Sequence, residues 1–277
     1  MNTYEMIQEV RANVGEGTAS HWGATEVLRK LSAHHRRVAA ILMLKQGDWL
    51  LTSTSLTASS GRLTLPVDCA KPVYMENSSG DEIPLQGTVR ERRWTRPAAS
   101  GLADGFQDAY LLDGYIEVND GSFGGTVTLW YQRRVWDLVG GTADTASTTN
   151  AIVVKVADGA SAKDDYYVGA TLEVIDGTGA GVSAPITDYV ASTRVITVTG
   201  SFGTDSIYGT VPQVPEEGHD LIVLGATLQL MAKPSSDLDE NVFKYYSSLY
   251  AEARSIFEDW CSTRKSGSTH VRRTEVD

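Results

Sequence analysis

The chain has 277 residues, with 24 Lys and Arg against 35 Asp and Glu, a formal net charge of −11, and 42% hydrophobic residues. This length suffices for one large domain or two smaller ones, each with a buried core. The longest apolar run, residues 38–44, is far too short to cross a bilayer, and the polar amino terminus does not resemble a signal peptide. We therefore expect no membrane partner and no secretion. The acidic balance also argues against a general nucleic-acid-binding protein, which needs excess cations to displace counterions from phosphate.

Four segments near the two ends of the chain predict helices. Their apolar residues recur at spacings of three, four or seven, and Gly or Pro residues mark their ends. His34 and His35 are interpreted as part of a polar helix face, together with the arginines that follow them. No amphipathic helix can bury its apolar stripe alone, so we expect the four helices to meet in one bundle. They are residues 3–14, about 20–46, 219–233 and about 237–264.

Short β-branched or alternating runs between the second and third helices predict strands. The clearest is a hairpin of residues 109–112 and 115–118, because the Asp113-Gly114 pair between them favours a two-residue type I′ turn. With the runs at residues 62–67, 73–75 and 126–131, this hairpin predicts a small antiparallel sheet beside the bundle.

Residues 141–212 differ in composition from the rest of the chain. They hold eight acids and three bases, a net charge of −5, whereas the other 205 residues hold 27 acids and 21 bases, a net charge of −6. Runs rich in Val, Ile and Thr alternate with Gly-rich or polar turns, and no helical period is present. This pattern predicts an all-β module, a small sandwich or barrel, inserted between the two halves of the helical frame.

The predicted fold class is therefore α+β: a helical bundle with a small antiparallel β-sheet, interrupted by an inserted all-β, sandwich- or barrel-like domain. The predicted parts are a frame of helices and a small sheet at residues 1–140, the inserted β domain at 141–212, the carboxy-terminal helices of the frame at 213–264, and a flexible arm at 265–277. The Ser, Gly and charged residues of the arm cannot form a core.

Four short motifs follow one another along the frame. They read Leu63-Thr-Leu-Pro-Val-Asp68, Tyr110-Leu-Leu-Asp-Gly-Tyr-Ile-Glu117, Thr128-Leu-Trp-Tyr131, and Val214-Pro-Glu-Glu-Gly-His-Asp-Leu-Ile-Val223. In this order and spacing the chain resembles the head-to-tail adaptor, or connector, proteins of tailed bacteriophages, over roughly residues 1–140 and 213–277. Residues 164–189 also resemble a β module that recurs in phage virion proteins.

The resemblance implies a structural virion protein without catalytic activity. Adaptors of this family form a homo-oligomeric ring, commonly of twelve copies, beneath the portal protein. The ring extends the DNA channel without sequence-specific DNA binding, and it provides the platform for the next tail or neck protein. The implied location is the neck of the virion, after assembly in the host cytoplasm. An acidic channel wall agrees with this role, because it repels phosphate and lets DNA slide.

Two cationic segments are candidate protein interfaces. Residues 90–96 combine four arginines with one tryptophan, the residue types most enriched at interface hot spots. A solvated loop, a subunit or portal contact and a DNA contact all remain open for this segment. In the family the carboxy-terminal arm often docks on the portal, and this implication is carried to residues 265–277 by position alone. The candidate interface residues are Arg90, Arg92, Arg93, Trp94, Arg96, Arg264, Lys265, Arg272 and Arg273.

Enzymatic chemistry has little support in the sequence. Cys69 and Cys261 have no metal-ligand spacing, and no catalytic triad, Walker or paired-carboxylate signature appears, so no catalytic residue, cofactor or metal is predicted. One alternative is a receptor- or glycan-binding virion or tail protein that uses the inserted β domain. There Tyr166, Tyr167, Tyr189 and Tyr208 would stack on sugars. Another is a wall-degrading tail enzyme with a site assembled from scattered residues.

Overall fold

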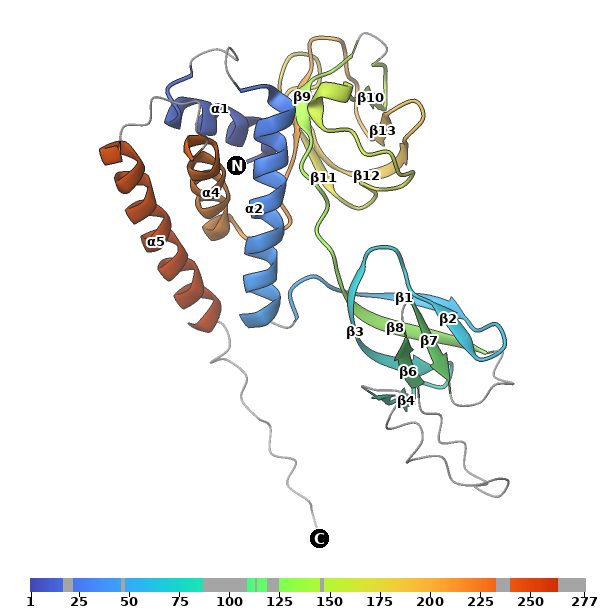
Figure 1. The fold of residues 1–277 in the computed structure, drawn as a ribbon. Coiled ribbons are helices and arrows are strands. Elements are labelled where there is room, and N and C mark those ends of the chain that lie inside the picture. The colour runs from blue at the N-terminus through green and yellow to red at the C-terminus, as the bar shows by residue number, and fades with distance from the viewer. Residues whose placement is uncertain are drawn as a thin grey trace, which may run out of the picture. The chain divides into compact units, whose positions relative to one another are not determined.

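The computed structural model describes residues 1–16, 22–45, 48–86, 109–112, 114–118, 125–144, 147–232 and 240–263 (Figure 1). The chain forms two compact units. Unit 1 combines Met1–Gln46 with Val135–Asp277, and unit 2 is Gly47–Arg134.

The helices of unit 1 are arranged around one central member. They are α1 (Thr3–Asn13), α2 (Ala24–Lys45), α4 (His219–Met231) and α5 (Glu240–Thr263). α4 contacts each of the other three (Figure 1). Leu221, Ile222, Ala226 and Leu230 of α4 are fully buried. A helix that is apolar on all sides is typical of a buried position, so α4 forms the core of the helical layer.

A six-stranded antiparallel sheet makes up the rest of unit 1. Its strand order is β10-β13-β12-β11-β14-β9, and the short 3-10 helix η1 (Val156–Asp158) follows β10. The backbone N–H of Asp144, just after β9, donates to the carbonyl of Val153 in β10 at 3.0 Å. The two edges of the sheet therefore approach one another, and the sheet curls around its own core. The strands are β9 (Gly140–Thr142), β10 (Ala151–Val153), β11 (Thr171–Asp176), β12 (Ser183–Val190), β13 (Val195–Val198) and β14 (Ile207–Thr210).

The start of α1 lies directly on this sheet. A Cβ atom at Gly209 of β14 would come within 2.8 Å of the backbone nitrogen of Tyr4, so only a residue without a side chain lets the helix approach this closely. Thr3 donates through Oγ1 to the carbonyl of Thr210 at 2.6 Å. Asn2 caps the helix and donates from Nδ2 to Glu173 of β11 at 3.0 Å. The helices and the curled sheet thus share one packed unit.

Unit 2 contains two four-stranded sheets, in the orders β1-β8-β3-β4 and β2-β7-β6-β5. All pairs are antiparallel except β5 with β6. Leu63, Met75, Ile116 and Leu129, two from each sheet, belong to one buried cluster, so the unit has its own core. The strands are β1 (Leu51–Thr57), β2 (Arg62–Thr64), β3 (Cys69–Asn77), β4 (Glu82–Ile83), β5 (Leu85–Gln86), β6 (Ala109–Leu112), β7 (Tyr115–Val118) and β8 (Thr126–Arg133).

The predicted fold class, a helical bundle with one small sheet and an inserted β domain, is wrong. The structure is mostly β, with three sheets, one of them curled, and four α-helices among the described residues. Strand β1 was missed because it reads Leu-Thr-Ser-Thr-Ser-Leu-Thr, which lacks an apolar face. It pairs with β8 along its whole length, from Leu51 with Gln132 to Thr57 with Thr126. Backbone pairing therefore defines this strand, and Leu56 adds an apolar contact with the core of unit 2.

Candidate functional site

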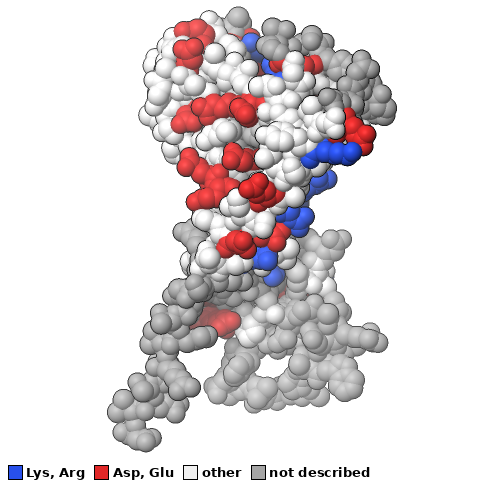
Figure 2. Space-filling view, turned by 90° about the vertical axis from the view of Figure 1, so that its left-hand side faces the viewer, with Lys and Arg blue, Asp and Glu red and all other residues white. Residues whose placement is uncertain are grey.

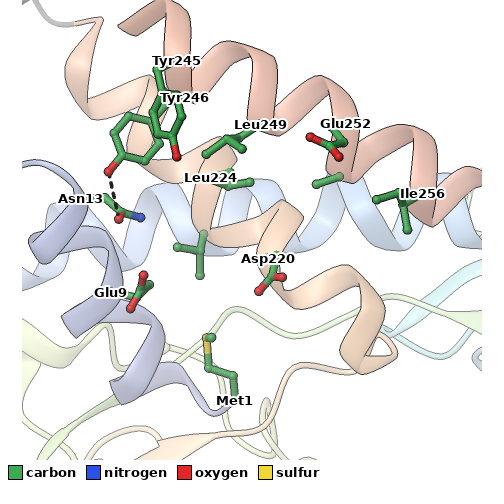
Figure 3. Close-up of a pocket in the computed structure, with 12 residues that line it drawn as sticks. Met1, Glu9, Asn13, Asp220, Leu224, Tyr245, Tyr246, Leu249, Glu252 and Ile256 are labelled. Atoms are coloured by element: carbon green, nitrogen blue, oxygen red, sulfur yellow. Dashed lines mark hydrogen bonds between the residues drawn. The ribbon is translucent and has the colours of Figure 1, made fainter. Parts of the chain in front are cut away.

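A groove lies between α1, α4 and α5 of unit 1 (Figure 3). Its volume of about 530 Å³ lies in the range of ordinary ligand and anchor pockets. α1 supplies one wall, α4 the floor and α5 the other wall. The lining residues are Met1, Glu9, Asn13, Asp220, Val223, Leu224, Tyr245, Tyr246, Leu249, Glu252, Ala253 and Ile256.

The α5 wall of the groove is apolar and incompletely covered. Tyr245 and Ile256 are each 59% exposed, and Val242, one turn before Tyr245, is 41% exposed. Only Phe257 and Cys261 of this helix are fully buried. The sequence predicts that the apolar stripe of α5 packs on another helix, and the structure satisfies this only in part. Exposed large apolar side chains gathered beside a groove are typical of a surface that binds another protein.

The rim of the groove is acidic. Glu9, Asp220 and Glu252 come from three different helices, and all three are exposed. No Lys or Arg is among the described residues that line the groove. Figure 2 shows acidic side chains spread over the face of unit 1 that carries α1 and α5, with the basic ones gathered along one edge. The groove therefore favours an occupant that combines cationic groups with an apolar anchor.

Hydrogen bonds fix the geometry of one end of the groove. Tyr246 of α5 donates through its hydroxyl to Oδ1 of Asn13 on α1 at 3.2 Å (Figure 3). Nδ2 of Asn13 in turn lies 3.5 Å from Oγ1 of Thr227 on α4. Partial burial, together with Tyr245 and Glu9 nearby, raises the pKa of the Tyr246 hydroxyl, which stays protonated and can donate. Polar contacts among all three helices therefore hold this end of the groove.

His34 and His35 do not form the polar surface that the sequence predicts, since the two residues are only 3% and 1% exposed. Nε2 of His35 accepts from the backbone N–H of Gln213 at 3.0 Å, which leaves Nδ1–H to donate to the carbonyl of Trp136 at 3.1 Å. Trp136 lies between β8 and β9, and Gln213 lies between β14 and α4, so one imidazole contacts both the segment that enters the curled sheet and the segment that leaves it. This role is structural.

The tyrosines proposed as a sugar-binding face are mostly inside the curled sheet. Tyr167, Tyr189 and Tyr208 are 0% exposed and belong to its core, and only Tyr166 is half-buried. Tyr167 packs edge-on against Tyr166 at 5.0 Å and against Tyr189 at 4.8 Å between ring centroids. Their rings therefore stabilise the β domain and cannot stack on a sugar as a set.

Neither a metal site nor a reactive thiol is found among the described residues. Within the described residues no three His, Cys, Asp or Glu side chains gather closely enough to hold a metal ion. Both cysteines are buried, and burial raises the pKa of each thiol, which disfavours the reactive thiolate. None of the described helices is both long and apolar enough to cross a membrane.

All nine interface residues predicted from the sequence lie outside the described residues, so those assignments stay predictions. The groove was missed because its walls come from residues 1–13, 220–224 and 245–256. The one local signal was the apolar stripe of α5, which the sequence assigned to packing within the helical bundle. No known protein family matches the chain, and no curated protein is significantly similar to it.

Proposed function

We propose that the protein is a structural assembly protein of a tailed-bacteriophage virion: a head-to-tail adaptor that forms a homo-oligomeric ring under the portal. The ring extends the DNA channel and provides the attachment platform for the next tail protein. The observation that carries the assembly role is the incompletely covered apolar wall of α5 beside an acidic groove. The assignment to the adaptor family is supported by the order of the sequence motifs described above.

The charge of the chain is compatible with a DNA conduit. A net charge of −11 disfavours tight binding of phosphate. DNA can then pass along the ring without being held. The glycan-binding alternative is weakened, because three of its four tyrosines are in the core of the β domain.

Electron microscopy of the purified protein, with and without the portal protein of the same phage, tests the proposed function. We expect rings that stack coaxially on the portal and copies that are monomeric or weakly associated when the portal is absent. A mixture with an unrelated portal provides the control, because it should yield no stacked rings. A particle that stays monomeric with its own portal at micromolar concentrations would overturn the adaptor assignment.

A further inference from the structure

We infer that the groove between α1, α4 and α5 binds the arginine- and tryptophan-rich segment of residues 90–96 from a second copy of this chain. This inference rests on the proposed ring and names the surfaces through which neighbouring copies meet. The occupant must match the groove in shape and charge. Each copy must also carry both the groove and the segment, so that it contacts one neighbour through the groove and another through the segment.

The groove sets two requirements for its occupant. Its centre is apolar, with Leu224 and Leu249 half-buried and Ile256 exposed at one edge (Figure 3). Its rim holds three carboxylates, from Glu9, Asp220 and Glu252, and no Lys or Arg among the described lining residues. A large apolar side chain must therefore fill the centre, with cationic groups placed on either side of it.

Residues 90–96 meet both requirements. They read Arg-Glu-Arg-Arg-Trp-Thr-Arg, so the Trp94 indole has arginines immediately before it and two residues after it, and the net charge is +3. Arginine pairs bidentately with carboxylates, and its planar guanidinium also stacks on aromatic faces such as the exposed ring of Tyr245. A tryptophan anchor in a pocket with arginine–carboxylate pairs around it is the usual composition of an interface hot spot.

Other cationic segments of the chain fit the groove less well. Arg133, Arg134 and Trp136 stand close together in sequence, but Trp136 is 9% exposed and belongs to the core of the curled sheet. Residues 264–277 carry four Lys or Arg but no aromatic ring. Among these segments, residues 90–96 combine a net charge of +3 with a tryptophan.

The occupant and the groove belong to different units of the chain. Residues 90–96 lie in unit 2 and the groove in unit 1. Each copy therefore carries two different, complementary surfaces. A contact of this heterologous kind passes from copy to copy and closes into a ring when the rotation between neighbours allows it. A self-complementary contact of two α5 helices would instead stop at a dimer.

A peptide-binding measurement tests the contact without requiring that rings form. The receptor is the full chain carrying Trp94→Ala, which removes the anchor of its own segment, and the probe is a labelled peptide of residues 86–100. We expect a micromolar dissociation constant. It should weaken about tenfold or more when the receptor also carries Glu252→Arg or when the peptide carries Trp94→Ala. Asp259→Arg, an exposed acid of α5 outside the groove, provides the matched control and should change binding less than about twofold.

Charge exchange and cross-linking identify the copy that supplies the segment. A peptide with Arg93→Glu should bind the receptor that carries Glu252→Arg more tightly than it binds the receptor that retains Glu252. In a mixture of isotopically light and heavy chains, assembled on the portal, cross-links from residues 90–96 to α5 should join light to heavy copies.

Absence of peptide binding, equal effects of Glu252→Arg and Asp259→Arg, or cross-links confined within single chains would each overturn the inference. Rings that form on the portal despite such results would leave the adaptor function standing, whereas peptide binding without rings would contradict the adaptor function alone.

Discussion

A chain in which alanine replaces His35 is expected to lose about 3–5 kcal/mol of its free energy of unfolding. The imidazole is 1% exposed and bonded to the backbone at both ring nitrogens, to Trp136 and to Gln213. Alanine would remove both hydrogen bonds of the imidazole and would open a cavity between α2 and the segments that border the curled sheet. Urea denaturation monitored by circular dichroism measures the loss.

Arg29→Ala provides the control for this substitution. Arg29 lies on the same helix, its side chain is 72% exposed, and its ion pair with Glu26 is a surface pair worth little. Its replacement should change the free energy of unfolding by less than about 0.5 kcal/mol. A loss below about 1 kcal/mol for His35→Ala would show that the segments at Trp136 and Gln213 do not depend on the imidazole.

The same histidine predicts how stability depends on pH. Burial, with smaller contributions from His219 and Arg36, lowers the pKa of His35 to about 4, from about 6.5 in an unfolded chain. Between these values the unfolded state binds more protons, so stability falls as the pH decreases from 6.5 to 4. The stability advantage of the wild-type chain over His35→Ala should therefore shrink by about 3 kcal/mol between pH 7 and pH 4. An advantage that stays constant over this range would contradict the assignment.

Replacing Gly225 by alanine should destabilise the helical layer by about 3 kcal/mol. A Cβ atom at this position of α4 would overlap the imidazole of His34 on α2. His34 is 3% exposed and contacts the ring of Tyr250 edge-on, at 6.1 Å between centroids, so it has little room to move away. The two helices must then separate. Thermal unfolding of the purified variant measures the effect.

Two further variants separate this clash from a general effect of adding a methyl group. Gly23 has no atom within 4 Å of the corresponding position, so Gly23→Ala should leave stability nearly unchanged. In a His34→Ala background, Gly225→Ala should cost nothing or stabilise by up to about 1 kcal/mol, because alanine favours the helix over glycine. An equal loss in both backgrounds would exclude the imidazole as the cause.

The helices were predictable because their signals are local. The predicted segment 3–14 corresponds to α1 at Thr3–Asn13, and 219–233 corresponds to α4 at His219–Met231. Apolar spacing within a helix, together with a glycine or proline after it, needs no information from distant residues. The hairpin of β6 and β7 was predictable for the same reason, since its turn sequence lies between the two strands that it joins.

The number of sheets was not predictable, because it depends on pairing between distant segments. β1 has no apolar alternation and is defined by β8, more than seventy residues later in the chain. β14 reads Ile-Tyr-Gly-Thr, and its glycine weakens the strand signal, yet that glycine allows α1 to pack on the sheet. The glycine that lowers the strand propensity of β14 is therefore the residue that makes the close contact with α1 possible.

The candidate site likewise combines features that were predictable from the sequence with features that were not. The apolar stripe of α5 follows from the sequence, but its exposure depends on tertiary packing. Tyr245 and Ile256 line the groove beside α1 and α4, and each stays 59% exposed. The sequence by itself determined the helices, the hairpin, the acidic charge and the cationic segment of residues 90–96, because each depends on neighbouring residues. Only the tertiary structure decided the three sheets, the buried histidines and the acidic groove, because each is assembled from segments that are far apart in the chain.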